Sequence, residues 1–327
     1  MISKAIRIKR NEIFSVLKIL KEMGIMDERF KIKKENEYAY IPIKFPIDGY
    51  EIFEIDFEEI RRKNNYMDFL KLPEEIKNYL PRSMDIVGNI AIIKLNEHVI
   101  PYSNEIAQAI MKFKKNIKTV ANDKGVKGEF RVRDLEIIGG NGLETIHTEN
   151  GIKIYVDLAK VYFSPRLSTE RARILSLIND NEIILDLFCG VGSFSLLIGK
   201  KRKVKIYAID KNPFAISCLK KSIEINKISN VVPILGDIRD VIHSIPNAKR
   251  AIVDLPLESL NYIDLIKNKA KIFHIYYKTD SPNKVKEEIE KQGLLVKNFN
   301  LVHGYSPTES MYVFDAIKVD NNDNSNT

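Results

Sequence analysis

In the stretch Ile183-Ile-Leu-Asp-Leu-Phe-Cys-Gly-Val-Gly-Ser-Phe-Ser195, an apolar run ends in an aspartate and a glycine turn follows at Gly190 and Gly192. This order predicts a buried parallel strand, a tight turn and a helix. Because glycine has no Cβ, such a turn lets a ligand approach the bare backbone. A second apolar run, Val204 to Ile209, ends in Asp210, about the spacing at which nucleotide-binding folds offer a carboxylate to a ribose. Together the two runs predict a site for a nucleotide-like cofactor, and the alternative is a purely structural βαβ unit.

The chain from Glu182 to about Val319 predicts one α/β domain. Pro213 to Asn226 predicts its clearest helix, with proline in the first turn. No helix is predicted between the last two strands, which a short connection joins. A terminal antiparallel hairpin on an otherwise parallel sheet is typical of S-adenosylmethionine-dependent methyltransferases, whereas dehydrogenases end on a parallel strand. The predicted strands are Ile183–Leu187, Val204–Ile209, Val231–Leu235, Arg250–Asp254, Lys271–Tyr277, Val296–Val302 and Met311–Val319.

Polar residues follow four of the predicted strands, at the end of the sheet where ligands bind. A carboxylate at Asp210 suits a ribose diol because it accepts two hydrogen bonds, and Asp237 would lie beside the adenine. Asp254, in Asp254-Leu-Pro256, has the place and shape of an element that holds a target base. Capping of strand ends is the alternative role for each. The predicted cofactor-binding residues are Asp186, Phe188, Gly190, Gly192, Asp210, Asn212, Asp237 and Pro256.

Length and composition limit the classes of protein that fit. A chain of 327 residues with 44% hydrophobic residues suits two or three folded domains. The two cysteines, Cys189 and Cys218, cannot build a disulfide framework, which favours a reducing cytoplasm. No apolar run approaches the ~20 residues of a membrane span, and the five histidines show no metal-ligand spacing, so metal catalysis is not expected. We expect a cytoplasmic monomer with a disordered tail at Asp320 to Thr327.

The main domain is predicted at 166–319. Before it, the sequence predicts two smaller α/β units at 1–70 and 71–165. In the second unit, Asp85 to Lys94 predicts a turn leading into a strand, and Asn104 to Phe113 predicts an amphipathic helix. The first unit contains the predicted helix Glu12 to Met23 and strands at Ala5 to Arg10, Tyr38 to Ile43 and Tyr50 to Phe57.

The most basic part of the chain extends from Lys112 to Arg133, and the whole chain has a net charge of +8. Such clusters dominate non-specific affinity for nucleic-acid phosphates, so the stretch predicts contact with nucleic acid; the alternative is a solvated charged face. Gly128 to Asp134 alternates charged and apolar residues, which predicts a strand with Arg131 and Arg133 on one side. The basic residues are Lys112, Lys114, Lys115, Lys118, Lys124, Lys127, Arg131 and Arg133.

The segment Val161-Tyr-Phe-Ser-Pro-Arg-Leu-Ser-Thr-Glu-Arg-Ala-Arg173 predicts a helix that Ser168 or Thr169 caps. Glu170 would lie in the first turn of this helix, where the helix dipole favours the anionic form of its side chain. The residues alone leave two roles open for Glu170, either complementing that dipole or taking part in chemistry.

Nine segments, in this order along nearly the whole chain, resemble the archaeal and eukaryotic tRNA methyltransferases that act on guanosine 37, beside the anticodon. The resemblance implies an N-terminal domain that recognises the outer corner of tRNA, a middle RNA-binding domain and a catalytic domain of the class I methyltransferase fold. It implies S-adenosylmethionine as cofactor and tRNA as partner, contacted at the anticodon loop and the outer corner. The segments are 39–44, 126–136, 145–151, 156–167, 170–174, 186–195, 207–213, 254–256 and 305–307.

The resemblance also implies roles for single residues. The general base of the family matches Glu170, and the arginine that stabilises negative charge on guanine O6 matches Arg131. The family's tyrosine in this run matches Tyr162, and its arginine beside the base matches Arg171. Guanine N1 is a poor nucleophile until Glu170 takes its proton, which moves charge onto O6, where Arg131 can meet it. The methyl group then transfers in line, mostly through positioning.

One position departs from the family pattern. Its guanosine-N1 members have Asn-Leu-Pro where this chain has Asp254-Leu-Pro256. Asparagine donates and accepts hydrogen bonds, whereas ionised aspartate only accepts them, so a carboxylate here favours exocyclic amines or a differently presented ring. The alternatives are therefore methylation at carbon 7 of the wyosine precursor 4-demethylwyosine at position 37, alone or as a second activity, and aminocarboxypropyl transfer at the same site. A catalytically silent tRNA-binding protein and a small-molecule methyltransferase are further alternatives.

Overall fold

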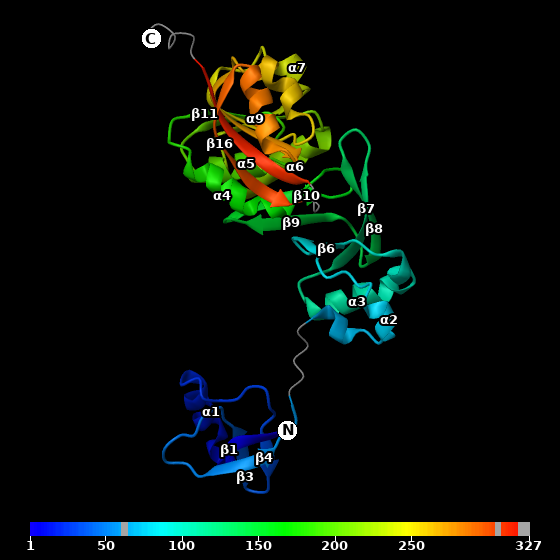
Figure 1. The fold of residues 1–327 in the computed structure, drawn as a ribbon, viewed down its shortest axis with the longest axis vertical. Helices are drawn as coiled ribbons and strands as arrows, with labels where there is room; N and C mark the ends of the chain where they lie inside the picture. Colours follow the sequence, from blue (N-terminus) through cyan, green and yellow to red (C-terminus); the bar gives the residue numbers. More distant parts are fainter. Residues whose placement is uncertain (60–64, 305–308, 320–327) are drawn as a thin grey trace. The chain divides into compact units, whose positions relative to one another are not determined.

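The computed structural model describes residues 1–59, 65–304 and 309–319 (Figure 1). The chain forms two compact units, Met1–Asp68 and Phe69–Thr327. The tail predicted at 320–327 and the matching segment 305–307 lie outside the described residues. Within the part of the chain that the structure describes, no helix is long and apolar enough to cross a membrane.

The first unit is a four-stranded antiparallel sheet covered by one helix. Its strands follow the order β2-β3-β1-β4. Val16 and Leu20 of the helix pack against Ile6, Ile8 and Ile41 of the sheet, and the helix predicted at Glu12 to Met23 is confirmed. The prediction missed β2, because this short strand is fully charged and has no apolar alternation. The elements are β1 (Ile2–Lys9), α1 (Ile13–Glu22), β2 (Lys33–Glu35), β3 (Tyr38–Pro42) and β4 (Ile52–Asp56).

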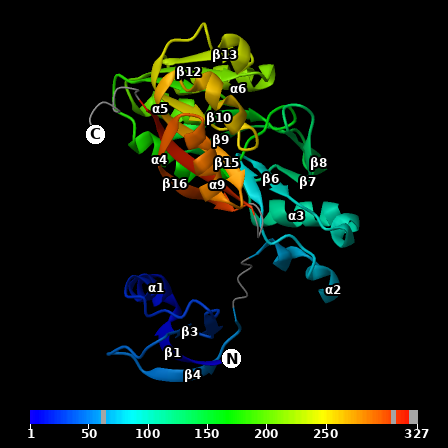
Figure 2. The same ribbon diagram turned by 45° about the horizontal axis from the view of Figure 1, so that its top comes forward.

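The second unit begins with a smaller four-stranded sheet of order β5-β6-β7-β8. Figure 2 shows α3 beside these strands, and its residues Ile106, Ala107 and Ile110 are buried. The predicted helix is confirmed. In the segment predicted as a turn leading into a strand, a short strand, β5, precedes the turn at residues 88–89, and the predicted strand follows as β6. The elements are α2 (Glu74–Lys77), β5 (Asp85–Val87), β6 (Ile90–Ile93), α3 (Ser103–Phe113), β7 (Thr119–Lys127) and β8 (Val132–Gly139).

The strand predicted at Gly128 to Asp134 is wrong in its first half. Residues 128–131 form the turn of the β7–β8 hairpin, and Arg131 donates its backbone N–H to the carbonyl of Gly128 at 3.1 Å. Both residues have positive φ, +70° at Gly128 and +51° at Arg131, so glycine supplies a left-handed conformation that breaks the extended backbone. The alternation therefore begins only at Val132, and Arg131 and Arg133 do not share one strand.

A seven-stranded sheet forms most of the second unit, in the order β13-β12-β11-β14-β15-β17-β16. Its first five strands are parallel, and β17 lies antiparallel between β15 and β16. All seven predicted strands and the terminal antiparallel hairpin are confirmed. The strands are β11 (Ile183–Asp186), β12 (Lys205–Asp210), β13 (Val231–Leu235), β14 (Ala248–Val253), β15 (Ala270–Thr279), β16 (Leu294–Gly304) and β17 (Ser310–Lys318).

Helices cover both faces of this sheet because neighbouring residues of a strand point to opposite sides. Ile184 packs in a core with α4, α5 and α6, whereas Leu185 packs in a second core with α7, α8 and α9. The hairpin of β9 (Glu144–Glu149) and β10 (Ile152–Asp157) joins the first core. The helices are α4 (Ser168–Ser176), α5 (Ser193–Lys201), α6 (Pro213–Asn226), α7 (Ile238–Val241), α8 (Ile263–Ile266) and α9 (Pro282–Lys291).

Candidate active site

The glycine turn after β11 is tied to the end of β12 by one carboxylate. Gly190 donates its backbone N–H to Asp210 Oδ2 at 2.7 Å, and Asn212 donates its backbone N–H to Oδ1 at 2.8 Å. The φ angles of Gly190 and Gly192 are +54° and +79°. Residues other than glycine rarely adopt this left-handed backbone conformation. The predicted strand, turn and helix therefore meet at the carboxyl ends of the central strands, beside Asp210.

Gly192 is needed for packing as well as for its backbone conformation. A Cβ at this position would lie 2.3 Å from Cδ1 of Leu219 on α6. Gly192→Ala is therefore expected to lower the free energy of unfolding by about 2–4 kcal/mol, from backbone strain and overpacking together. Gly142→Ala is the matched control, because Gly142 has a φ of +73° and a Cβ there would meet no described atom within 4 Å. Denaturant unfolding of both variants measures the difference, and equal losses would contradict the packing role.

Three carboxylates gather at this edge of the sheet. Asp186 is 1% exposed, accepts a hydrogen bond from Ser195 Oγ at 2.7 Å, and leaves Oδ1 without a partner among the described residues. Burial raises the pKa of Asp186 to about 7 and that of Asp254 to about 6, and it also raises the pKa of Asp210. Buried carboxylates favour their neutral forms when the surrounding positive charge and hydrogen-bond donors do not offset the burial. The edge is thus suited to a ligand that brings positive charge and hydrogen-bond donors.

Two of the predicted cofactor-binding side chains already cap helices. Asn212 Oδ1 accepts the backbone N–H of Phe214 at 3.0 Å, at the start of α6, and its Nδ2 donates to the carbonyl of Lys160 at 3.0 Å. Asp237 accepts the backbone N–H of Arg239 and pairs with its guanidinium at 2.5 Å, which lowers the pKa of Asp237 to about 2. The capping alternative therefore describes the contacts of both side chains, and their binding role stays a prediction.

Phe188 and Pro256 lie at the ends of β11 and β14 and are partly exposed. The Phe188 ring packs edge-on against Tyr262, with ring centroids 5.0 Å apart. The carbonyl of Pro256 accepts the backbone N–H of Lys278 at 2.8 Å. Both residues lie at the end of the sheet where the cofactor is predicted to bind, and their binding role stays a prediction.

Glu170 lies in the first turn of α4, as predicted, but the predicted cap is wrong. The residue before the helix is Leu167, and neither Ser168 nor Thr169 caps it with a side chain. A 3₁₀ turn that begins at Pro165 continues directly into α4, so Ser168 is already helical. Glu170 is 8% exposed.

The Glu170 carboxylate is held by two side chains that the sequence interpretation missed. Arg173, one turn later on α4, donates to both of its oxygens at 2.8 Å. The Tyr276 hydroxyl on β15 donates to Oε1 at 2.7 Å. The spacing of Arg173 is a signal that helix pairing rules could have found, whereas the position of Tyr276 depends on the sheet order.

Arg171 forms a buried ion pair with Glu149. It donates to Glu149 Oε1 at 2.5 Å and Oε2 at 2.8 Å, and it is 3% exposed. The positive charge of Arg171 also lowers the pKa of Asp254 and so offsets part of the increase that burial causes. Arg171 is thus close enough to Asp254 to act on its carboxylate, but its hydrogen bonds go to Glu149, to which the sequence interpretation gave no role. Its role beside the base stays a prediction.

Arg133, rather than Arg131, contacts Tyr162. The Arg133 guanidinium lies 5.7 Å from the centroid of the Tyr162 ring and pairs with Asp85 at 3.0 Å and Asp123 at 3.4 Å. Arg133 is 8% exposed, and these carboxylates neutralise its charge. Its guanidinium is therefore not available for the predicted contact with RNA phosphates. Arg131 is exposed in the hairpin turn. The expectation that both arginines project on the same side is wrong, because the turn separates them.

The tip of the β7–β8 hairpin lies beside the predicted cofactor edge. Glu129 pairs with Lys211 Nζ at 2.9 Å, and Lys211 Nζ lies 5.9 Å from the centroid of the Phe130 ring. Lys211 follows Asp210 directly in the chain, and Arg131 follows Phe130. Tertiary contacts thus bring the hairpin turn that contains Arg131 to the end of β12.

The predicted basic stretch is only partly free of ion pairs. Lys124 pairs with Glu136 at 3.0 Å, and Lys127 pairs with Asp134 at 2.5 Å, so these two lysines bridge the hairpin strands. The remaining predicted lysines follow α3 or lie at its end, where three are exposed and one is half-buried. They are Lys112, Lys115 and Lys118, and the half-buried Lys114.

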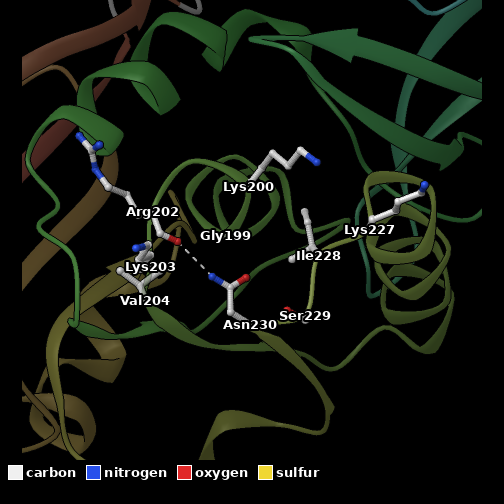
Figure 3. A pocket seen from close by; sticks show the side chains of 9 residues that line it. All are labelled: Gly199, Lys200, Arg202, Lys203, Val204, Lys227, Ile228, Ser229 and Asn230. Carbon is white, nitrogen blue, oxygen red and sulfur yellow. Dashed lines mark hydrogen bonds between the residues drawn. The ribbon is translucent and has the colours of Figure 1, made fainter.

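A cavity of about 460 Å³ lies near the amino ends of β12 and β13, and Figure 3 shows the side chains that line it. Its lining includes Arg202, Lys203 and Asn230, which precede β12 and β13, and Asn230 Nδ2 donates to the carbonyl of Arg202 at 3.1 Å. Ligands of such sheets bind at the carboxyl ends of the strands, and this cavity lies at the amino ends. It is separate from the site described above.

Among the described residues, no group of three His, Cys, Asp or Glu side chains could hold a metal ion.

The sheet order with antiparallel β17, the glycine turn and the strand-end carboxylates define a class I methyltransferase fold. Residues 145–301 match the TRM5/TYW2 methyltransferase domain, 67–143 the TYW2 N-terminal domain, and 5–51 the tRNA methyltransferase 5 N-terminal domain. The chain belongs to the TRM5/TYW2 methyltransferase family, which confirms the resemblance drawn from its motifs.

Three relatives illustrate this likeness. The chain is 42% identical over 278 residues to the tRNA (guanine(37)-N(1))-methyltransferase Trm5b of Pyrococcus abyssi, covering 83% of each chain. The crystal structure of that protein has a TM-score of 0.81 and covers 96% of this chain and 99% of its own. The complex of aTrm5 and tRNALeu is 34% identical, with a TM-score of 0.78 and the same coverage. A Pyrococcus horikoshii tRNA(Phe) (4-demethylwyosine(37)-C(7)) aminocarboxypropyltransferase is 34% identical over 160 residues, 49% of this chain and 57% of its own.

Proposed function

We propose that this protein transfers a methyl group from S-adenosylmethionine to N1 of guanosine 37 in tRNA. The observation that carries the proposal is the buried carboxylate of Glu170, which Arg173 and Tyr276 orient on the same unit as the glycine turn. The P. abyssi relative named for this activity supports it across most of the chain.

The residues at the sheet edge fit S-adenosylmethionine. Each oxygen of Asp210 accepts one backbone N–H, which leaves each a lone pair for a ribose hydroxyl. The unpartnered Oδ1 of Asp186 would accept a hydrogen bond from a charged amino group. The bound cofactor supplies a methyl carbon on a positively charged sulfur, which is a good leaving group. The other proposed contacts come from Phe188, Gly190, Gly192, Asn212, Asp237 and Pro256.

Glu170 would act as the general base. It takes the proton from guanine N1, and the electron pair left on N1 forms the new bond to the methyl carbon, while the pair of the broken carbon–sulfur bond goes to sulfur. Negative charge that develops on O6 would be met by Arg131 on the hairpin tip. Tyr162 and Arg171 would line the place of the target base, and Asp254 would face that base from the end of β14.

tRNA is the proposed partner. The exposed lysines of the basic stretch would contact its phosphates, since such contacts supply most of the sequence-independent affinity. We keep the three-domain division at 1–70, 71–165 and 166–319 as part of this proposal, with the first domain on the outer corner of the tRNA and the second as an RNA-binding domain. The proposed phosphate contacts are Lys112, Lys114, Lys115 and Lys118, with Lys124, Lys127 and Arg133 also predicted from the sequence.

Methylation of the wyosine precursor at position 37 is the second candidate. Two observations favour it, namely the match of residues 67–143 to the TYW2 N-terminal domain and the carboxylate of Asp254. Asp254 has no hydrogen-bond partner among the described residues, and burial raises its pKa to about 6. Below that pH its neutral acid both donates and accepts, as an amide does. Above that pH its anion would oppose the charge that develops on the base.

Methylation of defined tRNA substrates tests the proposal. An unmodified transcript with guanosine 37 and the same tRNA with 4-demethylwyosine at that position are each incubated with methyl-labelled cofactor, and mass spectrometry of the digests names the modified atom. We expect N1-methylguanosine at position 37 of the first substrate. No incorporation into the first and methylation of carbon 7 in the second would replace the proposal with the second candidate.

Asp254→Asn is measured in the same assay from pH 5.5 to 7.5. The ratio of the variant rate to the wild-type rate is expected to rise with pH, because the amide stays neutral while the Asp254 carboxyl ionises above its pKa of about 6. A ratio independent of pH would show that the charge of Asp254 does not act on the transferring base.

A further inference from the structure

The hydrogen bonds of Glu170 leave one of its oxygens partly free. Oε1 accepts from both the Tyr276 hydroxyl and Arg173 Nη2, and Oε2 accepts from Arg173 Nε. A carboxylate has about four lone-pair sites, two on each oxygen. Both sites of Oε1 are occupied, so the remaining site belongs to Oε2.

We propose that Arg173 and Asp315 form a positioning pair that directs the proton of the target base to Oε2 of Glu170 and sets how basic that oxygen is. This inference rests on the proposed role of Glu170 as general base. Arg173 touches no reacting atom in this proposal, and it acts by fixing the plane of the carboxylate.

Arg173 is shared between two carboxylates. Its Nη1 donates to Asp315 Oδ2 at 2.8 Å and its Nη2 donates to Oδ1 at 3.3 Å, while its Nε and Nη2 bind Glu170. Asp315 lies on β17 and Glu170 on α4. The negative charge of Asp315 offsets part of the attraction that Arg173 exerts on the Glu170 carboxylate. Asp315 therefore keeps Glu170 more basic than a private ion pair with Arg173 would.

Asp315 is itself held from behind by His274 on β15. Its Oδ1 lies 2.5 Å from His274 Nδ1, and His274 Nε2 lies 2.8 Å from Arg250 Nη1. Arginine can only donate, so Nε2 accepts and Nδ1 bears the proton that His274 donates to Asp315. Burial lowers the pKa of His274, in agreement with this neutral form.

Arg250 anchors the far end of this chain of contacts. It donates to Glu182 at 3.1 Å and to the carbonyl of Leu177 at 2.8 Å, and it is 5% exposed. A neutral histidine between Asp315 and Arg250 brings no extra positive charge to Arg173. The plane of the Asp315 carboxylate is thus fixed by contacts on β14 and β15, and the orientation of Arg173 follows from it.

The groups that face Glu170 lie on four elements. They are Arg173 on α4, Tyr276 on β15, Asp254 after β14 and, through Arg173, Asp315 on β17. If the positioning pair sets the basicity of Glu170, removal of either partner should move the acidic limb of the rate profile, and the two removals should move it in opposite directions.

Single-turnover methylation of the guanosine-37 transcript, measured from pH 4.5 to 8.5 at saturating cofactor, tests the inference. Asp315→Asn leaves Arg173 to Glu170 alone, so the acidic limb is expected about 0.5–1 pH unit lower. Arg173→Met removes the cation, so the limb is expected about 1–2 pH units higher. Loss of orientation should also lower the plateau rate of Arg173→Met about 10-fold or more.

Asp264→Asn is the matched control, because Asp264 is an exposed carboxylate on α8 that pairs with Lys267, and its profile should equal that of the wild type. Tyr276→Phe should retain more activity than Arg173→Met, because it removes one donor and leaves the plane fixed. Limbs that stay in place in both Arg173→Met and Asp315→Asn, whatever their melting temperatures, would overturn the inference. An active Glu170→Gln would instead overturn the assignment of the base.

Discussion

Glu170→Gln is expected to slow methyl transfer to guanosine 37 about 10²–10⁴-fold in single-turnover assays, the usual contribution of a general base. The amide cannot take the N1 proton, so the guanine stays a poor nucleophile. Direct binding of the cofactor and of the tRNA should change little, because Glu170 lies on α4 and not on the glycine turn.

The variant also turns an amide against Arg173, which donates to both oxygens of the native carboxylate. Its melting temperature must therefore be measured beside its rate. Glu288→Gln, an exposed change on α9, serves as control and should leave both unchanged. A folded Glu170→Gln protein with wild-type rate would exclude Glu170 as the base.

Asp210→Ala is expected to weaken binding of S-adenosylmethionine about 10²–10⁴-fold. Two hydrogen bonds from ribose hydroxyls to a carboxylate would be lost, at about 1.5–3 kcal/mol each. The change also removes the acceptor that holds the backbone N–H groups of Gly190 and Asn212. Equilibrium dialysis with labelled cofactor measures the affinity without requiring catalysis.

Asp180→Ala is the matched control for this experiment. Asp180 Oδ1 also accepts a backbone N–H, from Lys203 at 2.9 Å, but Lys203 lies before β12, at the amino end of that strand. A similar loss of affinity in both variants would indicate general damage to the fold. An unchanged affinity in Asp210→Ala would contradict the proposed ribose contact.

The sequence alone located the end of the sheet that carries the predicted cofactor-binding residues, because local signals identify the ends of the strands. Apolar runs of strand length, each followed by a glycine or an acidic residue, identify the carboxyl ends of parallel strands. Asp186, Asp210 and Asp254 lie at such ends. The hairpin turn was predicted less well, since Gly128 broke an alternation that otherwise indicated a strand. This alternation predicts that Arg131 and Arg133 lie on one side of a strand, although Arg131 is exposed in the turn and Arg133 is buried in β8.

The sequence alone was sufficient for the seven strands of the large sheet, the helix Pro213–Asn226, the glycine turn and the family, because these depend on residue preferences and periodicity along short segments. Only the tertiary structure decided which charged groups meet around Glu170. Tyr276 is 106 residues from Glu170, and Asp315 is 142 residues from Arg173. The contact of Asp315 requires that β17 insert antiparallel beside β15. The order of strands in a sheet and their register depend on packing across the whole domain, and no local pattern specifies them.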